Sequence, residues 1–424
     1  MKNMVIRNFI CGDSMKVRTS NLGMSFHDII SYRIKERVKY SELVKYLTNV
    51  SRRSKQVDLI NLATGSPSPD LIPRNELINA LNEAIKEFES YVFEYPPALG
   101  INRLRREISE YLRRIGVNVN NDYEVIIGSG TFQVLDLIGK VLLDDDNCVL
   151  VEEPTFIDAI ATLRFYVKQL DTVPLDESKD YKSLRLDKLS KLICKKPKVF
   201  YTIPTSQNPT GTTYDDNVRK EIVDVMSSNN IVIIEDDIYR AIFKINYEPL
   251  MNICIKRNVP CIYLSSFSKV LAPGLRIAYA LVPKELMEYF ASANLLTLSL
   301  SNVTMYMVYE LLRNNVLIKR RELLNEVYMS RLKALKDSLS DYLREYASWN
   351  EDALGFYIMV RIKGINSRKL FSQALKNGVG FIPGHIFFIK KDSVNTLRLS
   401  VAKEPEERIV EGVRRLAKSV KELL

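Results

Sequence analysis

Residues 261–279 read CIYLSSFSKVLAPGLRIAY, a short apolar run that leads almost directly into a lysine, Lys269. The run predicts a buried strand, and a lysine beside a buried strand costs free energy unless an anion neutralises it or a reaction uses it. The stretch therefore indicates a ligand site at the end of a strand. The other polar residues of the stretch that could contact such a ligand are Ser266, Ser268 and Arg276.

Six short β-rich runs of this kind alternate with helical segments between residue 101 and about residue 300. This pattern predicts an α/β lobe with a mainly parallel sheet that is buried on both faces. Such sheets bind ligands at the carboxyl ends of their strands. The runs are VIIG (125–128), CVLVEEP (148–154), KVFYTIP (198–204), NIVIIEDD (230–237), CIYLSS (261–266) and RIAYALVP (276–283).

The segments on either side of this lobe predict a second, smaller α+β lobe. Helical periodicity covers residues 24–55 and 305–345, and strand-like FYIMVRI and NTLRLSV flank a further helix near the C-terminal end. The expected division is a loose arm (1–23), a large domain (85–305) and a small domain (24–84 and 306–424). Asn75 to Phe88 predicts an amphipathic helix, and Met15 and Met24 are alternative translation starts.

The composition of the 424 residues is that of a globular protein, with 46% hydrophobic and 26% charged residues. No apolar run is long enough to span a membrane, and the N-terminal segment lacks the features of a secretory signal. The five cysteines are scattered and the chain has only two histidines, which predicts no metal site and reduced thiols in the cytoplasm.

The formal net charge of +10 has three readings: a nucleic-acid partner, a site that attracts anionic substrates, or solvated helix faces. Charges of both signs alternate with apolar positions at helical spacing in residues 315–345 and in the last twenty residues. That spacing favours solvated faces, and we expect neither a nucleic-acid nor a membrane partner.

Three other strand ends carry unusual residues. GSGTFQ (128–133) opens a helix, so it forms either an anion site made of backbone N–H groups or an ordinary glycine turn capped by Thr131. TIPTSQNPTG (202–211) forms either a plain turn or a rigid turn, with or without a cis peptide, that aims Asn208 at a ligand.

IVIIEDDIYR (231–240) ends a buried strand with acids, which are costly there unless a cation or a protonated ring nitrogen pairs with them. Tyr239 lies three residues beyond Asp236, within reach of the same ligand. An exposed loop or a magnesium site are the alternatives, but no phosphate-binding GxxxxGK[ST] loop accompanies the acids. An anion cradle, an acid for a ring nitrogen and an imine-forming lysine together describe one ligand, pyridoxal 5'-phosphate.

PTSQNPTG, EDDIYR and SFSKVLAPGLRIAY also resemble the motifs of the class I/II aminotransferases of fold type I. The resemblance runs from about residue 57 to about residue 403 and is greatest to the branch of aminoadipate and kynurenine aminotransferases. It implies a large lobe with a mainly parallel seven-stranded sheet, a smaller α+β lobe, and transfer of an amino group between an α-amino acid and a 2-oxo acid. Glutamate and 2-oxoglutarate are one expected substrate pair.

The resemblance also implies roles for individual residues. Lys269 would bind the cofactor aldehyde as an imine and later move the substrate proton, while Asp236 would pair with the pyridine nitrogen. Asn208 and Tyr239 would contact the phenolic oxygen. The phosphate would bind Ser266, Ser268, Arg276 and the turn of Gly130, Thr131 and Phe132.

Four more residues receive roles in the same way. Phe156 would stack on the pyridine ring, unless it is core packing, and Arg398 would bind the substrate α-carboxylate through two hydrogen bonds. Gly65 would lie over the substrate, unless it is a simple turn glycine. Tyr95 would reach the phosphate of a neighbouring subunit, which implies a homodimer.

Two departures from the family pattern affect what the resemblance implies. Phe132 stands where a polar side chain is common, which leaves one phosphate contact open. ALGFYIMV replaces a double-glycine segment near the substrate, so the preferred amino acid is not predicted. A lyase or decarboxylase on the same fold is an alternative activity. A transcription regulator is a remote one, since a DNA-binding winged helix before residue 60 is not evident.

Overall fold

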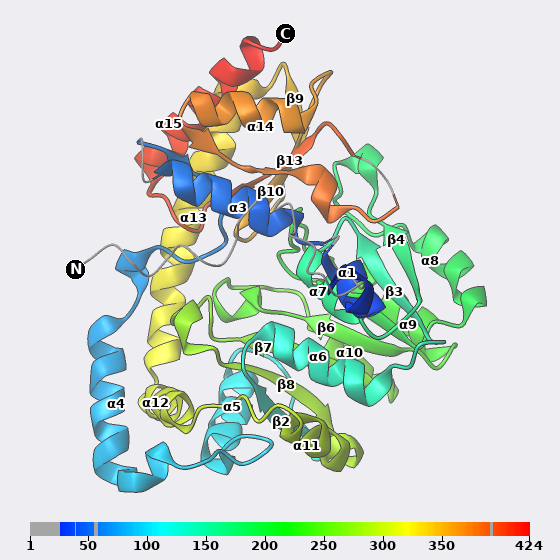
Figure 1. The fold of residues 1–424 in the computed structure, drawn as a ribbon, viewed down its shortest axis with the longest axis vertical. Helices are drawn as coiled ribbons and strands as arrows, with labels where there is room; N and C mark the ends of the chain where they lie inside the picture. Colours follow the sequence, from blue (N-terminus) through cyan, green and yellow to red (C-terminus); the bar gives the residue numbers. More distant parts are fainter. Residues whose placement is uncertain (1–25, 39, 55–57, 391–392) are drawn as a thin grey trace.

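The computed structural model describes residues 26–38, 40–54, 58–390 and 393–424. The expected arm of residues 1–23 and the alternative starts Met15 and Met24 lie outside the described residues. Figure 1 shows a lower lobe, which holds the larger sheet, and an upper lobe, which contains the C-terminus.

The lower lobe is built on a seven-stranded sheet with the strand order β2-β8-β7-β6-β5-β3-β4. Every neighbouring pair is parallel except the two pairs that β8 makes. The prediction of a mainly parallel sheet with seven strands is therefore confirmed. The strands are β2 (Tyr123–Gly128), β3 (Cys148–Glu153), β4 (Gln169–Pro174), β5 (Val199–Thr202), β6 (Val232–Asp236), β7 (Cys261–Ser266) and β8 (Ala278–Pro283).

Two strands differ from what the apolar runs alone indicate. β8 is antiparallel because only a short loop, residues 267–277, joins it to β7, whereas parallel neighbours need a longer crossover. β4 has no apolar run, since Gln169 and Asp171 interrupt it. It lies at the edge of the sheet, where one long side is free of a neighbouring strand, so its sequence does not need to be continuously apolar.

Amphipathic helices cover this sheet (Figure 1). α9 shows why they begin where they do, because the Asp215 carboxylate accepts hydrogen bonds from the backbone N–H groups of Asn217 and Val218. The helices are α5 (Asn102–Arg114), α6 (Thr131–Leu142), α7 (Ile157–Leu163), α8 (Leu186–Leu192), α9 (Asp216–Ser227), α10 (Leu250–Arg257) and α11 (Met287–Leu295).

The upper lobe holds a four-stranded antiparallel sheet in the order β12-β13-β10-β9 and a two-stranded parallel ribbon, β1-β11. The predicted strands FYIMVRI and NTLRLSV are confirmed as β10 and β13. The strands are β1 (Ile60–Asn61), β9 (Ala347–Trp349), β10 (Tyr357–Ile362), β11 (Val379–Gly380), β12 (Ile382–Pro383) and β13 (Thr396–Ser400), and the helices are α3 (Glu42–Ser54), α14 (Ser367–Lys376) and α15 (Glu406–Lys421).

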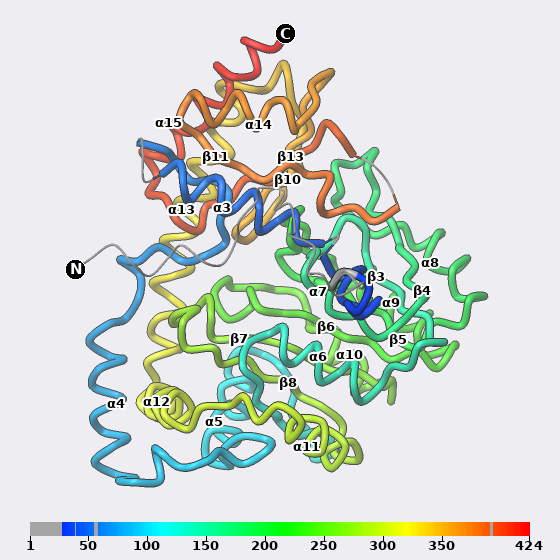
Figure 2. Tube along the Cα trace, viewed as in Figure 1, coloured from blue at the N-terminus to red at the C-terminus, as the bar shows by residue number. Residues whose placement is uncertain are grey.

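The remaining helices connect or flank the lobes. In the trace of Figure 2, α3 lies in the upper lobe, whereas α4 lies beside α12 at the lower lobe. The long helix α13 runs from the level of α12 up to the small sheet. The helices are α1 (Phe26–Ile29), α2 (Tyr32–Val38), α4 (Arg74–Phe88), α12 (Asn302–Arg313) and α13 (Val316–Leu343).

The strand register brings the predicted site residues to one edge of the large sheet. Thr202 of β5 is opposite Glu235 of β6, and Asp236 is opposite Leu264 of β7. Because these strands are parallel, their carboxyl ends and the loops that follow lie together. The upper lobe contributes Gly65 and Arg398, which contact the same edge through Lys269 and Asn208.

Candidate active site

A cavity of about 230 Å³ lies at the carboxyl ends of β5, β6 and β7. Ten residues that the sequence predicts for the site line this one cavity, together with Ile203, Ile238, Pro273 and Tyr357. The ten are Thr131, Phe132, Phe156, Asn208, Asp236, Tyr239, Ser266, Ser268, Lys269 and Arg276.

Lys269 is half-buried, and its Nζ donates a hydrogen bond to the carbonyl oxygen of Gly65 at 2.8 Å. Burial lowers the pKa of this ammonium, and the positive charges of Arg398 and Arg276 lower it further. A lysine in this environment gives up its proton more readily than one in water. The environment thus favours the neutral amine, which is the form that can attack an aldehyde.

Asp236 is 2% exposed at the end of β6, and one of its oxygens accepts a hydrogen bond from the Tyr201 hydroxyl at 2.7 Å. Burial raises the pKa of Asp236 to about 7, although the Tyr201 hydrogen bond acts in the opposite direction. Among the described residues, no lysine or arginine forms an ion pair with Asp236. A cationic ring nitrogen in the cavity would stabilise the buried carboxylate.

Arg398 is 3% exposed and lies between two aromatic rings, with its guanidinium 4.2 Å from the Tyr357 centroid and 4.8 Å from the Phe387 centroid. Its two Nη atoms donate to the Asn208 side-chain oxygen and the Ala63 carbonyl, both at 2.9 Å. Its buried Nε has no hydrogen-bond partner in the described part of the chain. All of these partners are neutral, so the site suits an incoming carboxylate.

Asn208 follows β5, and its peptide bond to Pro209 is cis. The sequence allowed either a plain turn or a rigid turn here, and the cis peptide corresponds to the rigid turn. Because the side-chain oxygen of Asn208 accepts from Arg398, its NH₂ group is left to donate into the cavity. The neighbouring Tyr239 hydroxyl is hydrogen-bonded to that of Tyr357, and burial raises the pKa of Tyr239 well above its ordinary value.

Phe132 and Phe156 line one side of the cavity as a stacked pair, with centroids 6.0 Å apart and planes at 17°. Phe132, the departure from the family pattern, is therefore an aromatic neighbour of Phe156 rather than a polar group. Its backbone still belongs to the first turn of α6, whose N–H groups have no partners within the helix.

Another part of the cavity lining contains hydroxyl and guanidinium groups. Ser266 and Ser268 are hydrogen-bonded through their side chains at 3.0 Å, and the exposed Arg276 donates to the carbonyl of Ser129. Gly130 has a φ of +85°, and a Cβ there would collide with the Arg276 guanidinium. The start of α6, two hydroxyls and one arginine together form a cradle that suits a phosphate.

These groups fit pyridoxal phosphate in their chemistry. The buried carboxylate suits the ring nitrogen, the cradle that excludes a Cβ suits the phosphate, and the amine of lowered pKa suits the aldehyde. Three predicted residues lie beside the cavity rather than in its lining, namely Gly65, Gly130 and Arg398.

Tyr95 is the predicted residue that the chain does not bring to the cavity. Its side chain is 89% exposed, and its backbone carbonyl accepts a hydrogen bond from Asn302 of α12. Within one subunit it contacts none of the cavity residues that the structure describes.

The structure adds residues that sequence reasoning missed. Tyr201 and Tyr357 looked like core positions within apolar strands, so no local signal marked them. Glu152 is fully buried and accepts hydrogen bonds from Gln207, Tyr214 and the backbone of Ile203, which holds the loop that carries Asn208. The sequence did contain a signal for these hydrogen bonds, because buried polar residues at a strand end require partners. The signal was the pair of acids Glu152 and Glu153 together with Gln207.

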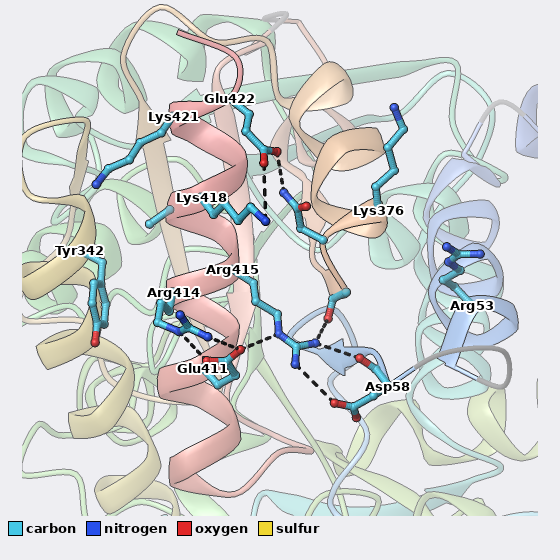
Figure 3. A pocket seen from close by; sticks show the side chains of 13 residues that line it. Arg53, Asp58, Tyr342, Lys376, Glu411, Arg414, Arg415, Lys418, Lys421 and Glu422 are labelled. Atoms are coloured by element: carbon cyan, nitrogen blue, oxygen red, sulfur yellow. Dashed lines mark hydrogen bonds and ion pairs between the residues drawn. The ribbon is translucent and has the colours of Figure 1, made fainter.

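A larger hollow of about 1040 Å³ lies in the upper lobe and is lined by charged residues (Figure 3). Its acids are already paired, since Asp58 accepts from Arg415, Glu411 from Arg414 and Arg415, and Glu422 from Asn377. It lacks the combination of buried, unpaired charges that marks the cavity at the strand ends. The smaller cavity is therefore the candidate active site.

Two features that the described residues lack bear on other classes of function. These residues contain no group of three or more His, Cys, Asp or Glu side chains placed to hold a metal ion. No helix in the same residues is long and apolar enough to cross a membrane.

Comparison with known proteins agrees with this geometry. Residues 57–416 match the family model described as aminotransferase class I and II. The chain is 33% identical to 2-aminoadipate transaminase of Thermus thermophilus over 86% of this chain and 91% of the relative. It is 30% identical to aromatic-amino-acid aminotransferase 1 of Thermococcus litoralis, over 86% and 88% of the two chains. The crystal structure of Pyrococcus horikoshii kynurenine aminotransferase superimposes with a TM-score of 0.86 at 30% identity, covering 96% of this chain and 100% of that one.

The raised pKa of Asp236 predicts a pH-dependent stability of the protein freed of cofactor. The folded state holds this proton up to about pH 7, whereas an unfolded aspartate loses it near pH 4. Between these values the unfolded state binds fewer protons, so this group's contribution to stability falls as pH rises. In chemical unfolding between pH 5 and 7, wild type should lose about 2 kcal/mol relative to Asp236→Asn.

The exposed helix position Asp341 offers a matched control, because Asp341→Asn removes one carboxylate outside the cavity. Wild type and this control should follow the same pH dependence. Parallel curves for wild type and Asp236→Asn would show that Asp236 does not hold a proton in the folded state.

Proposed function

The chain belongs to the class I and II aminotransferase family and is a pyridoxal-phosphate-dependent enzyme, and we propose that glutamate and 2-oxoglutarate form one of its substrate pairs. Its substrates are amino acids and 2-oxo acids. The observation that carries the proposal is the buried Arg398, whose hydrogen-bond partners are neutral and whose guanidinium suits the α-carboxylate that both substrates share.

The glutamate pair draws support from charge and from one relative. The cavity and its border carry two arginines, Arg276 and Arg398, against Asp236 as the one carboxylate in the lining, which favours anionic ligands. The relative from Thermus thermophilus is named for 2-aminoadipate, a dicarboxylic amino acid one methylene longer than glutamate. A substrate with two carboxylates suits this excess of positive charge.

Each cavity residue has a proposed task. When bound, pyridoxal phosphate supplies an aldehyde for amine exchange and a ring that withdraws electrons from the substrate Cα. Asp236, fixed by Tyr201, keeps the ring nitrogen protonated, and Phe156, backed by Phe132, packs on the ring face.

Two further groups hold the ligands in place. The phosphate is bound by Ser266, Ser268, Arg276 and the turn of Gly130 and Thr131. The phenolic oxygen accepts hydrogen bonds from the NH₂ of Asn208 and the hydroxyl of Tyr239. Arg398 fixes the substrate carboxylate and thereby places the Cα–H bond. The Lys269 amine, with its lowered pKa, moves the proton between the substrate Cα and the cofactor carbon C4′.

An amino-acid panel tests the proposed pair. With 2-oxoglutarate as acceptor, the enzyme should form glutamate from several donors and show ping-pong kinetics. Turnover with other 2-oxo acids but none with 2-oxoglutarate or glutamate would refute the pair and leave the aminotransferase assignment intact. Cofactor alone, without protein, is the blank for non-enzymatic exchange.

The same assay addresses the lyase alternative. Supplied with an amino acid and no 2-oxo acid, an aminotransferase stops after one half-reaction per site. Steady release of ammonia or pyruvate under these conditions would instead support a lyase.

We also propose that the enzyme is a homodimer in which Tyr95 reaches the phosphate of the neighbouring subunit. Tyr91, Phe93 and Tyr95 lie on one short segment and are 63%, 66% and 89% exposed. Aromatic side chains grouped in this way are enriched at protein interfaces. A second copy of the chain that covers this segment would explain their exposure in one subunit.

The dimer predicts that Tyr95→Phe weakens cofactor binding although Tyr95 lies outside the cavity of its own subunit. The lost hydrogen bond to a charged group should raise the cofactor dissociation constant about tenfold or more. Sedimentation should show a dimer for both proteins. Tyr91→Phe is the control, and a monomer with unaltered cofactor affinity in Tyr95→Phe would contradict the proposal.

Two other assignments stay predictions. We propose the division into residues 85–305 and residues 24–84 with 306–424. Within it, α4 of the second part packs on α12 of the lower lobe. A cytoplasmic location is supported by the described cysteines, which are all free thiols. These are Cys148, Cys194, Cys254 and Cys261.

A further inference from the structure

Tyr357 occupies a central position in the site, and neither the family motifs nor the sequence assigned it a role. It begins β10, which pairs with β13 so that Met359 is opposite Arg398. A residue two positions from Met359 points to the same face of the sheet, so Tyr357 is a diagonal neighbour of Arg398. Its side chain is 4% exposed and lines the cavity.

The ring of Tyr357 supports the Arg398 guanidinium. The guanidinium carbon lies 4.2 Å from the ring centroid, with Phe387 on its other side at 4.8 Å. A cation held between two ring faces keeps one plane, while its N–H edge stays free to donate. The ring therefore orients the group that receives the substrate carboxylate.

The hydroxyl of Tyr357 contacts a second functional residue. It is hydrogen-bonded to the Tyr239 hydroxyl, and the two rings meet edge to face with centroids 6.2 Å apart. Each phenol has a single proton to donate. Besides burial, the hydrogen bond raises the pKa of Tyr239, since it stabilises the protonated phenol, and it fixes the position of the Tyr239 oxygen beside the cavity.

The same hydroxyl rests against Gly65. A Cβ added at Gly65 would collide with the Tyr357 hydroxyl oxygen, so only glycine fits under it. The carbonyl of Gly65 accepts the hydrogen bond from Lys269 at 2.8 Å. Tyr357 thereby limits where that carbonyl, and with it the lysine amine, can lie.

We propose that Tyr357 is a positioning residue that links the substrate-carboxylate site at Arg398 to the reacting amine of Lys269, its ring acting on Arg398 and its hydroxyl on Tyr239 and Gly65. The proposal rests on the proposed roles of Arg398 and Lys269. The ring and the hydroxyl of Tyr357 thus have different effects on the kinetics, and two substitutions can distinguish them.

Tyr357→Phe keeps the ring and removes the hydroxyl. We expect kcat to fall about tenfold, as for the loss of one hydrogen bond, with KM for amino and oxo acids changed less than about twofold. The pH at which the absorption band of the bound cofactor changes should also shift, because the surroundings of Tyr239 and Lys269 are altered.

Tyr357→Leu removes the ring as well. KM should then rise about tenfold in addition to the fall in kcat, because the guanidinium loses one of its two aromatic faces. Tyr111→Phe is the matched control, since this buried tyrosine makes no hydrogen bond through its hydroxyl within the described residues and lies outside the cavity. Its kcat, KM and absorption titration should equal those of wild type.

Arg398→Ala separates failure of this inference from failure of the proposed function. A large rise in KM in Arg398→Ala with no rise in Tyr357→Leu overturns the ring's role alone. An unchanged KM in Arg398→Ala overturns the carboxylate clamp and the ring's role together. An unchanged kcat and absorption titration in Tyr357→Phe overturns the role of the hydroxyl, and this variant tests it even if Tyr357→Leu fails to fold.

Discussion

The site depends on ionisable groups at the carboxyl edge of the large sheet that are fully or partly buried and whose hydrogen-bond partners are neutral. Asp236 has the Tyr201 hydroxyl as its partner, Arg398 has an amide and a carbonyl, and Lys269 has the carbonyl of Gly65. Neutral partners fix the geometry of these side chains but compensate only part of the cost of removing a charge from water. On the proposed roles, ionic groups of the cofactor and the substrate would supply the missing compensation, and one arrangement would serve both ligands.

Both lobes contribute side chains to the site, because the site residues come from two sheets. The parallel strands β5, β6 and β7 deliver the loops that carry Asn208, Asp236 and Lys269 to one edge. The antiparallel pair β10 and β13 delivers Tyr357 and Arg398 from the other lobe. Contacts between the lobes, such as Arg398 to Asn208, therefore connect the substrate side of the site to the cofactor side.

Much of this arrangement follows from sequence, for physical reasons that also set its limits. Asp236 and Lys269 were visible because charges beside apolar strands are costly, and the alternation of strands and helices predicted the parallel sheet. Tyr201 and Tyr357 were hidden because a tyrosine within an apolar strand has the same pattern as core packing. The direction of β8 and the position of β4 depend on loop length and on place in the sheet, so the strand runs do not reveal them. The role predicted for Tyr95 would need a second subunit, so the fold of one chain does not test it.

The central claim is that Lys269 is the amine that reacts, since burial and two neighbouring arginines lower its pKa beside the cavity. Borohydride reduction of the protein loaded with pyridoxal phosphate, followed by peptide mapping, tests this claim most directly. We expect one phosphopyridoxyl group per chain, attached to Lys269, and no transaminase turnover by Lys269→Ala. Attachment at another lysine, or full turnover by Lys269→Ala, would contradict it.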